Sequence, residues 1–150
     1  MPTLVLDTNI VLDLFVFADA RAHPLNEHLE RGDAHWLATQ AMRDELERVL
    51  AYAHIESRLD FYGLQAVDVL TRFDRHVRIV DAPPKAPVTC KDPDDQKFID
   101  LAVAHRSMLL SKDAAVLAMT KRLALLEVIA APVMPTVSSL SRSPNLSCRT

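Results

Sequence analysis

The chain has 150 residues, of which 49% are hydrophobic, and a formal net charge of -3 at pH 7. This length suits one domain, the apolar content excludes a disordered chain, and the charge supplies no general basic field that would attract nucleic acid. Only two glycines are present, which argues against the glycine-rich phosphate loops and nucleophile elbows of dinucleotide-binding proteins, P-loop hydrolases and α/β-hydrolases.

The first half of the chain alternates between segments typical of strands and of helices. The predicted elements are a strand at 4–6, a helix at 9–18 capped by Thr8 or Asn9, a loop with a short helix near 25–30, a strand at 34–38, a helix from the cap Thr39 to about 52, and a helix at 57–74. In the last of these helices we expect four residues to face inward, namely Leu59, Leu64, Val67 and Leu70. Gly63 permits a break there, because glycine weakens a helix interior.

The second half continues the alternation. It predicts a strand at 77–80, a loop at 81–93 that holds four prolines, a helix at 94–105, a strand at 107–110, a helix from 113 to about 121 and a last strand at 125–129. Strands that alternate with helices indicate an α/β fold whose parallel sheet carries helices on both faces. We expect one domain over residues 1–140 and a flexible tail over 141–150, which is rich in Ser, Arg and Pro.

Four acidic residues are predicted to converge on one edge of this sheet. Asp7 and Asp113 each follow an apolar strand, Asp95 precedes a helix, and Glu45 lies beside the apolar stripe of the helix after the second strand. Each has a simpler explanation, since acids cap helices and favour their N-terminal dipoles. Their common position is the stronger signal, because ligands of open α/β sheets bind at the carboxyl ends of the strands.

A cluster of carboxylates repels itself unless a cation lies among them. Oxygen-only ligands select hard cations such as Mg²⁺ or Mn²⁺, which orient phosphodiesters and lower the pKa of bound water. Asn9 and Ser111 stand close to these acids in the sequence and are candidate supporting residues. The six histidines show no zinc-binding spacing.

Four segments together resemble a PIN domain. They are residues 4–9 (Leu-Val-Leu-Asp-Thr-Asn), 44–46 (Asp-Glu-Leu), 92–102 (which begins Asp-Pro-Asp-Asp) and 110–113 (Leu-Ser-Lys-Asp). The resemblance covers about residues 3–140 and is greatest to the branch of toxin components of toxin–antitoxin systems, the VapC-like ribonucleases. It implies a three-layer α/β/α sandwich and a ribonuclease that depends on Mg²⁺ or Mn²⁺.

The resemblance also implies roles for individual residues. The catalytic and metal-binding acids would be Asp7, Glu45, Asp95 and Asp113, and the supporting residues would be Asn9, Asp92 and Ser111. Two departures stand out, because the branch commonly has Gly where this chain has Lys112 and Asp where it has Ala115. Lys112 would contact a phosphate or compete with metal for a carboxylate.

Basic residues near the predicted site are candidates for contact with the RNA backbone, in particular Arg43, Lys97 and Lys112.

Two alternative functions stay open at this point. One is a PIN-like module that binds metal or RNA without cutting, and the other is a phosphohydrolase with Asp7 as nucleophile, which lacks the usual second acid because Asn9 stands there.

The expected setting follows from the same sequence. Two distant cysteines without a CxxC partner favour a reducing, cytoplasmic location, and no signal peptide or membrane span is predicted. The resemblance to the toxin branch implies an RNA substrate and a small antitoxin partner, and oligomers, dimers above all, are common in the family.

Overall fold

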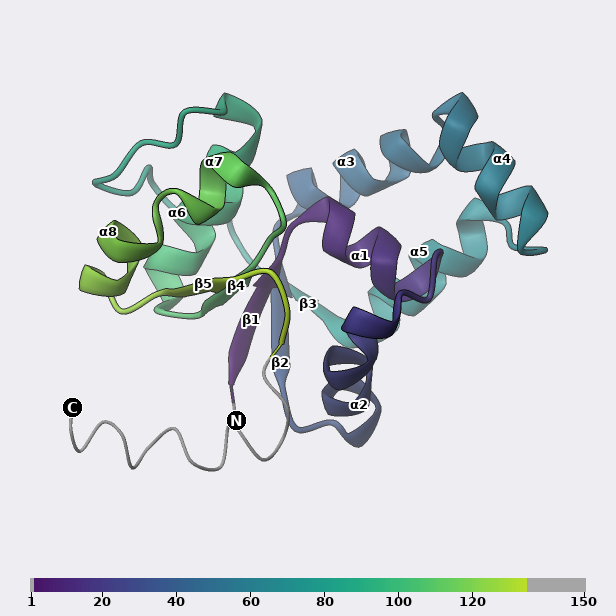
Figure 1. The fold of residues 1–150 in the computed structure, drawn as a ribbon, viewed down its shortest axis with the longest axis horizontal. Helices are drawn as coiled ribbons and strands as arrows, with labels where there is room; N and C mark the ends of the chain where they lie inside the picture. The colour runs from purple at the N-terminus through teal and green to yellow at the C-terminus, as the bar shows by residue number, and fades with distance from the viewer. Residues whose placement is uncertain (1, 135–150) are drawn as a thin grey trace.

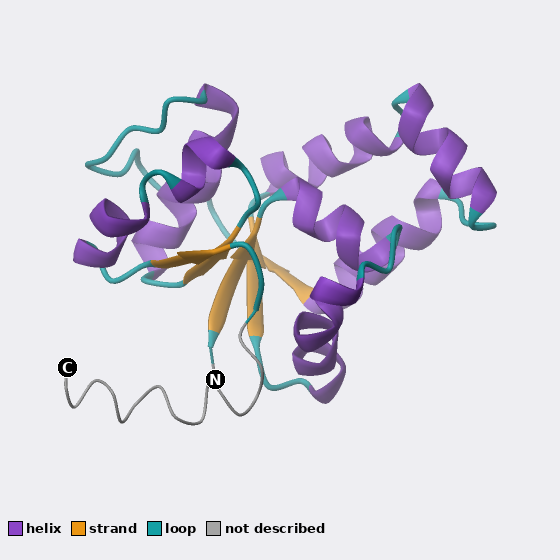
Figure 2. Ribbon diagram, in the orientation of Figure 1, coloured by secondary structure: helices purple, strands orange, loops and turns teal. Residues whose placement is uncertain are grey.

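The computed structural model describes residues 2–134, which form a five-stranded sheet between two layers of helices (Figure 1, Figure 2). The strands are β1 (Thr3–Leu6), β2 (His35–Ala38), β3 (Val77–Ile79), β4 (Met108–Leu110) and β5 (Ile129–Ala131). They lie in the order β3-β2-β1-β4-β5, and every neighbouring pair is parallel. This confirms the predicted α/β/α sandwich, while the predicted tail at 141–150 lies outside the described residues.

Helices cover both faces of the sheet (Figure 1). One layer contains α1 (Thr8–Phe15), α2 (His23–Arg31), α3 (Gln40–Leu50), α4 (Ala53–Phe61) and α5 (Ala66–His76), with a 3₁₀ turn η1 at Ala20–Ala22. The other contains α6 (Gln96–His105), α7 (Ala114–Leu117) and α8 (Thr120–Leu125), with the 3₁₀ turn η2 (Pro93–Asp95) before α6. Among the described helices none is long and apolar enough to cross a bilayer.

The central strands are buried on both faces, which explains their unbroken apolar runs. Leu4 and Val5 on β1 and Leu109 on β4 have no exposed surface. Beside β2, the ring of Trp36 meets Phe73 of α5 edge to face, with 5.1 Å between the ring centroids. From β1 the chain adds β2 and β3 on one side, and then β4 and β5 on the other, so the strand order reverses between β1 and β4. In open parallel sheets the ligand-binding crevice lies at the carboxyl ends of the strands at this point.

The predicted helix at 57–74 is two helices in the structure. The chain leaves α4 after Phe61 and turns through Gly63, whose φ of +69° lies in the left-handed region that favours glycine. Leu59 and Leu70 are buried as predicted, but Val67 is 59% exposed, because the turn ends the single apolar stripe on which that prediction depended. Together α3, α4 and α5 form an arm that extends away from the sheet (Figure 1).

Three further predictions need correction at element ends. The cap of α1 is Asp7 instead of Thr8 or Asn9, because its carboxylate accepts a hydrogen bond from the backbone N–H of Asn9. The helix predicted from residue 113 is divided into α7 and α8. The last strand lies at Ile129–Ala131 instead of 125–129, since α8 continues to Leu125 and Glu127 then adopts a φ of +66° in the turn.

Candidate metal centre

Asp7 stands where β1 ends and α1 begins. One carboxylate oxygen, Oδ1, accepts the helix-capping hydrogen bond, and the other, Oδ2, accepts a 2.7 Å hydrogen bond from the hydroxyl of Ser111. The side chain of Asn9 is not part of this cap, because only its backbone N–H takes part and the residue is exposed. Both oxygens of a buried carboxylate are therefore held in place by the protein.

The segment after β4 brings Ser111 and Asp113 to the same edge. Ser111 has no exposed surface, and its Oγ also accepts a 3.0 Å hydrogen bond from the backbone N–H of Asp113. Asp113 then caps α7 through one oxygen, which accepts a hydrogen bond from the N–H of Ala115. Ser111 therefore connects the acid at the end of β1 to the acid after β4.

The turn η2 contributes two more acids. Asp92 caps the turn through the N–H of Asp94, and Asp95 closes it with only 7% of its surface exposed. Carboxylate oxygens of Asp92, Asp95 and Asp113 all lie within 4.8 Å of one another. Asp92, which the sequence suggested only as a supporting residue, thus belongs to the central cluster.

Burial and mutual repulsion change the acidity of this cluster. Burial, followed by the negative charges of Asp7, Asp113 and Asp92, raises the pKa of Asp95 to about 7. Burial also raises the pKa of Asp7, although the hydrogen bonds from Ser111 and Asn9 oppose that shift. Both shifts arise first from burial, and the neighbouring carboxylates add to them.

A divalent cation fits these residues. Oδ2 of Asp95 is buried and has no hydrogen-bond partner among the described residues, which is costly for a carboxylate oxygen. Asp92 and Asp113 use one oxygen each as helix caps and leave the other for a ligand. Three carboxylates at this spacing are a donor set for a hard cation such as Mg²⁺ or Mn²⁺.

Glu45 lies beside this cluster with its own partners. Its Oε1 accepts a 2.7 Å hydrogen bond from the hydroxyl of Thr8, and its Oε2 accepts a 3.1 Å hydrogen bond from the ammonium of Lys97. Its negative charge still contributes to the raised pKa of Asp7. The sequence predicts Thr8 or Asn9 as a helix cap and gives no signal for the contact between Thr8 and Glu45.

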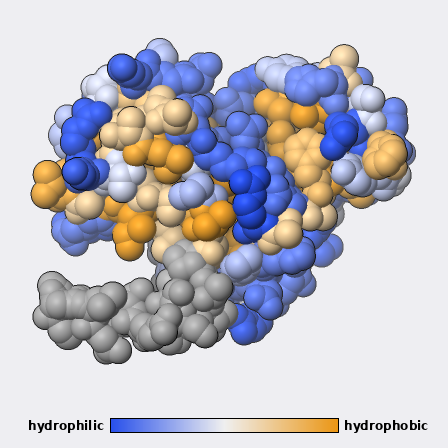
Figure 3. All heavy atoms as spheres, viewed as in Figure 1, coloured by the Kyte–Doolittle hydropathy of each residue, from blue (hydrophilic) through white to orange (hydrophobic). Residues whose placement is uncertain are grey.

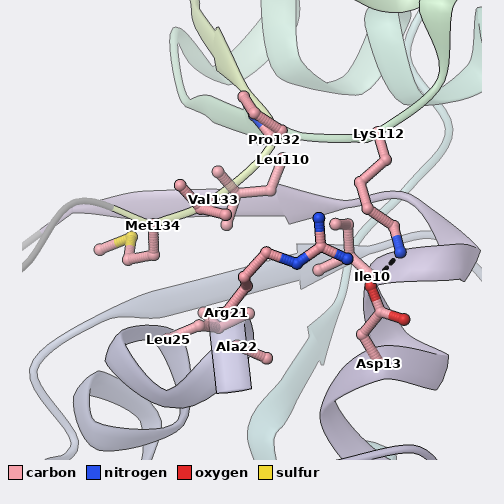
Figure 4. Close-up of a pocket in the computed structure, with 10 residues that line it drawn as sticks. All are labelled: Ile10, Asp13, Arg21, Ala22, Leu25, Leu110, Lys112, Pro132, Val133 and Met134. Carbon is pink, nitrogen blue, oxygen red and sulfur yellow. Dashed lines mark ion pairs between the residues drawn. The ribbon is translucent and has the colours of Figure 1, made fainter. Parts of the chain in front are cut away.

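The other two predicted RNA-contacting cations are paired with acids outside the cluster. Figure 4 shows Lys112 reaching from the loop after β4 to Asp13 on α1, so Lys112 does not occupy a carboxylate of the cluster. The adjoining crevice leaves only about 10 Å³, which is the lower limit for a single water molecule. Arg43 makes two hydrogen bonds to Asp74 on α5, of 2.7 and 2.9 Å.

Comparison with known proteins agrees with this geometry. A search of curated proteins found no match. The sequence model of the PIN domain matches residues 3–115, a stretch that contains β1 through β4 and every acid of the cluster. PIN domains are generally nucleases that depend on Mg²⁺ or Mn²⁺, and an acidic site of the required kind is present. Because the match spans most of the chain and includes the site, the protein belongs to the PIN-domain family.

Proposed function

We propose that this protein is an endoribonuclease that uses Mg²⁺ or Mn²⁺ to hydrolyse RNA phosphodiester bonds. The observation that carries the proposal is the cluster of Asp92, Asp95 and Asp113, with an unpartnered buried oxygen on Asp95, inside a PIN domain. These three residues would hold the cation, with Asp7 beside them. A bound ion of this class orients the phosphodiester, activates water and neutralises charge on the leaving oxygen.

The chain's own groups account for the remaining requirements of hydrolysis. Water adds to phosphorus, the ester oxygen leaves, and the proton of the water must be accepted by a base. Asp7 suits that role because its pKa is raised and Ser111 fixes its orientation. Three basic residues are predicted to contact RNA, and Lys97 is the one that bonds to Glu45, an acid beside the cluster. We therefore propose that Lys97 contacts the RNA backbone.

Cleavage of end-labelled single-stranded RNA tests the proposal directly. Purified wild type is assayed with Mn²⁺, with Mg²⁺ and with EDTA, beside Asp95→Asn and the exposed neighbour control Asp94→Asn. We expect cutting that requires metal, disappears in Asp95→Asn and persists in Asp94→Asn.

One observation favours a second candidate function. The resemblance leads one to expect a further acid at position 115. Ala115 stands there instead and supplies only a backbone N–H to Asp113. A PIN domain that binds metal or RNA without hydrolysis would give no cleavage with any cation, although Mn²⁺ would still raise its melting temperature. Equal activity of wild type and Asp95→Asn would instead contradict the proposed role of the cluster.

We further propose that the protein acts in the cytoplasm as the toxin of a toxin–antitoxin pair, with a small antitoxin as its partner. The support is the resemblance of its motifs to that branch. Expression in a bacterial host tests this, since the wild type should arrest growth and Asp95→Asn should not. Growth arrest by both forms would show that toxicity does not depend on the acidic cluster.

A further inference from the structure

The loop that leads from β3 to the acidic turn η2 has no regular structure of its own. Residues 81–92 contain no helix or strand, and the three prolines among them lack a backbone N–H. Within the part of the chain that the structure describes, no backbone-to-backbone hydrogen bond involves residues 81–91. Ala86 and Cys90 are nevertheless buried, so the backbone groups around them need polar partners of another kind.

Gln96, the first residue of α6, supplies two of these partners. Its Oε1 accepts a 2.7 Å hydrogen bond from the backbone N–H of Cys90, and its Nε2 donates a 3.0 Å hydrogen bond to the backbone carbonyl of Val88. An amide side chain carries an acceptor and a donor side by side, so it satisfies both groups at once. Because a partly buried backbone group that loses its partner is costly, Gln96 fixes the loop at these two residues.

Asp100 lies one turn further along the same face of α6. Its Oδ1 accepts a 2.8 Å hydrogen bond from Nε2 of Gln96 and a 2.9 Å hydrogen bond from the backbone N–H of Ala86. The carboxylate therefore holds the loop at a third residue and sets the direction in which the amide of Gln96 faces. We call Gln96 and Asp100 together the α6 clamp.

The α6 clamp fixes the chain on both sides of two acids of the cluster. Asp92 follows Cys90 by two residues, and Asp95 comes directly before Gln96. The carboxylates of Asp92, Asp95 and Asp113 repel one another when no cation lies among them. The clamp resists their separation because it holds the loop before Asp92 against the helix after Asp95. A site that is preorganised in this way binds its ligand more tightly.

We propose that Gln96 and Asp100 are positioning residues of the metal centre: through the loop they hold Asp92 beside Asp95 at the separation that binds the cation. Asp100 is not among the acids whose oxygens lie within 4.8 Å of one another, so it acts on the ion through the loop. The inference rests on the metal centre of the proposed function and not on cleavage, so it is tested without RNA.

The first test measures Mn²⁺ binding from the electron paramagnetic resonance signal of the free ion. Gln96→Ala should weaken binding by about tenfold, as is usual when a group that orients a ligand is removed. The matched control is Gln40→Ala, because Gln40 is also the first residue of its helix and donates to an acid one turn later, Asp44. This control should bind within about twofold of wild type. Equal affinity of wild type and Gln96→Ala would overturn the proposal.

Two substitutions of Asp100 separate its position from its charge. Asp100→Asn keeps an oxygen that accepts from Ala86 and Gln96, and it should bind Mn²⁺ within about twofold of wild type. Asp100→Ala removes that oxygen and should lose as much affinity as Gln96→Ala. If Asp100→Asn lost as much as Asp100→Ala, the charge of Asp100 would act on the cation directly, which would overturn the positioning role.

A further control separates positioning from a general loss of stability. Val69→Ala opens a cavity beside α5, in the other helix layer, and should lower the free energy of unfolding without weakening Mn²⁺ binding. A loss of affinity in Val69→Ala as large as that in Gln96→Ala would contradict a specific role of the clamp. If Gln96→Ala does not fold, Gln96→Glu replaces it, because it keeps the acceptor for Cys90 but turns a carboxylate oxygen towards the carbonyl of Val88.

Hydrogen exchange of the metal-free protein gives a second readout. Gln96→Ala should speed exchange at the amide of Cys90, and Asp100→Ala should do so at the amide of Ala86. The amide of Asp7, which bonds to Leu110 within the sheet, should be unchanged in both variants. Unchanged exchange at Cys90 and Ala86 would overturn the clamp.

The two proposals fail in different ways. If wild type bound no Mn²⁺, the metal centre of the proposed function would fail, and this inference with it. If wild type bound Mn²⁺ and the clamp variants bound it equally well, only this inference would fail.

Discussion

Asp95 combines burial with the charges of three neighbouring acids, and its pKa of about 7 links protein stability to pH. In the unfolded chain the same group has its ordinary pKa near 3.8. Its contribution to stability is fully present below about pH 4 and is lost as the pH rises towards 7, because the unfolded state releases its proton first. The metal-free site is therefore less favourable at neutral pH than at pH 4.

We expect Asp95→Asn to become more stable relative to wild type as the pH increases. In EDTA, the melting temperature of the variant minus that of wild type should grow between pH 5 and pH 8, since the amide never carries the buried charge. Asp94→Asn, on an exposed neighbour, should show no such trend. A difference that stays constant over this range would mean that Asp95 titrates as an ordinary carboxyl.

Ser111 offers a second prediction at the level of one side chain. Its fully buried hydroxyl donates to Asp7 and accepts from the N–H of Asp113, so Ser111→Ala leaves both partners without their bonds. Loss of such bonds costs about 1–3 kcal/mol, measured by urea denaturation. Ser107→Ala removes only a long 3.4 Å bond to a carbonyl and should cost less. Equal costs would contradict the role assigned to Ser111.

Between elements, the ion pair of Lys112 and Asp13 ties the loop after β4 to α1. Both side chains are partly buried, at 32% and 12% exposure, so their attraction is stronger than that of a surface pair. A double-mutant cycle with Lys112→Met and Asp13→Asn should give a coupling of about 1 kcal/mol or more. Arg21 and Asp19, an exposed pair, should give less in the same measurement. A coupling energy no larger than that of Arg21 and Asp19 would show that the ion pair of Lys112 and Asp13 adds no extra stability.

The sequence predicted the elements better than the contacts between them. An apolar run followed by an acid is a local signal, so β1 and β4 and the convergence of Asp7 and Asp113 at the sheet edge could be foreseen. Contacts between distant residues leave no such signal, as for Lys112, whose partner Asp13 lies on another element. The sequence permits a break at Gly63 but does not require one, because the apolar spacing looks continuous on both sides of this residue.

At the scale of the whole molecule, the site lies where the strand order reverses, and the arm extends away from it (Figure 1). Figure 3 shows hydrophobic surface over this arm, and the residues exposed around α4 and α5 are Tyr52, Phe61, Tyr62 and Val67. Phe61 alone is 79% exposed. Phe61 and Tyr62 contact each other edge to face, and exposed apolar side chains of this size favour burial against another surface.

We therefore expect a homodimer that forms through the arm, as the resemblance to the toxin branch also implies. Light scattering during size-exclusion chromatography should give twice the monomer mass for wild type. Phe61→Asp should shift the protein to monomer, because it places a charge in the apolar contact. The control is Leu125→Asp, which changes an equally exposed residue on α8, in the opposite layer, and should leave the dimer intact. A monomeric wild type, or a dimer lost only in Leu125→Asp, would contradict an interface on the arm.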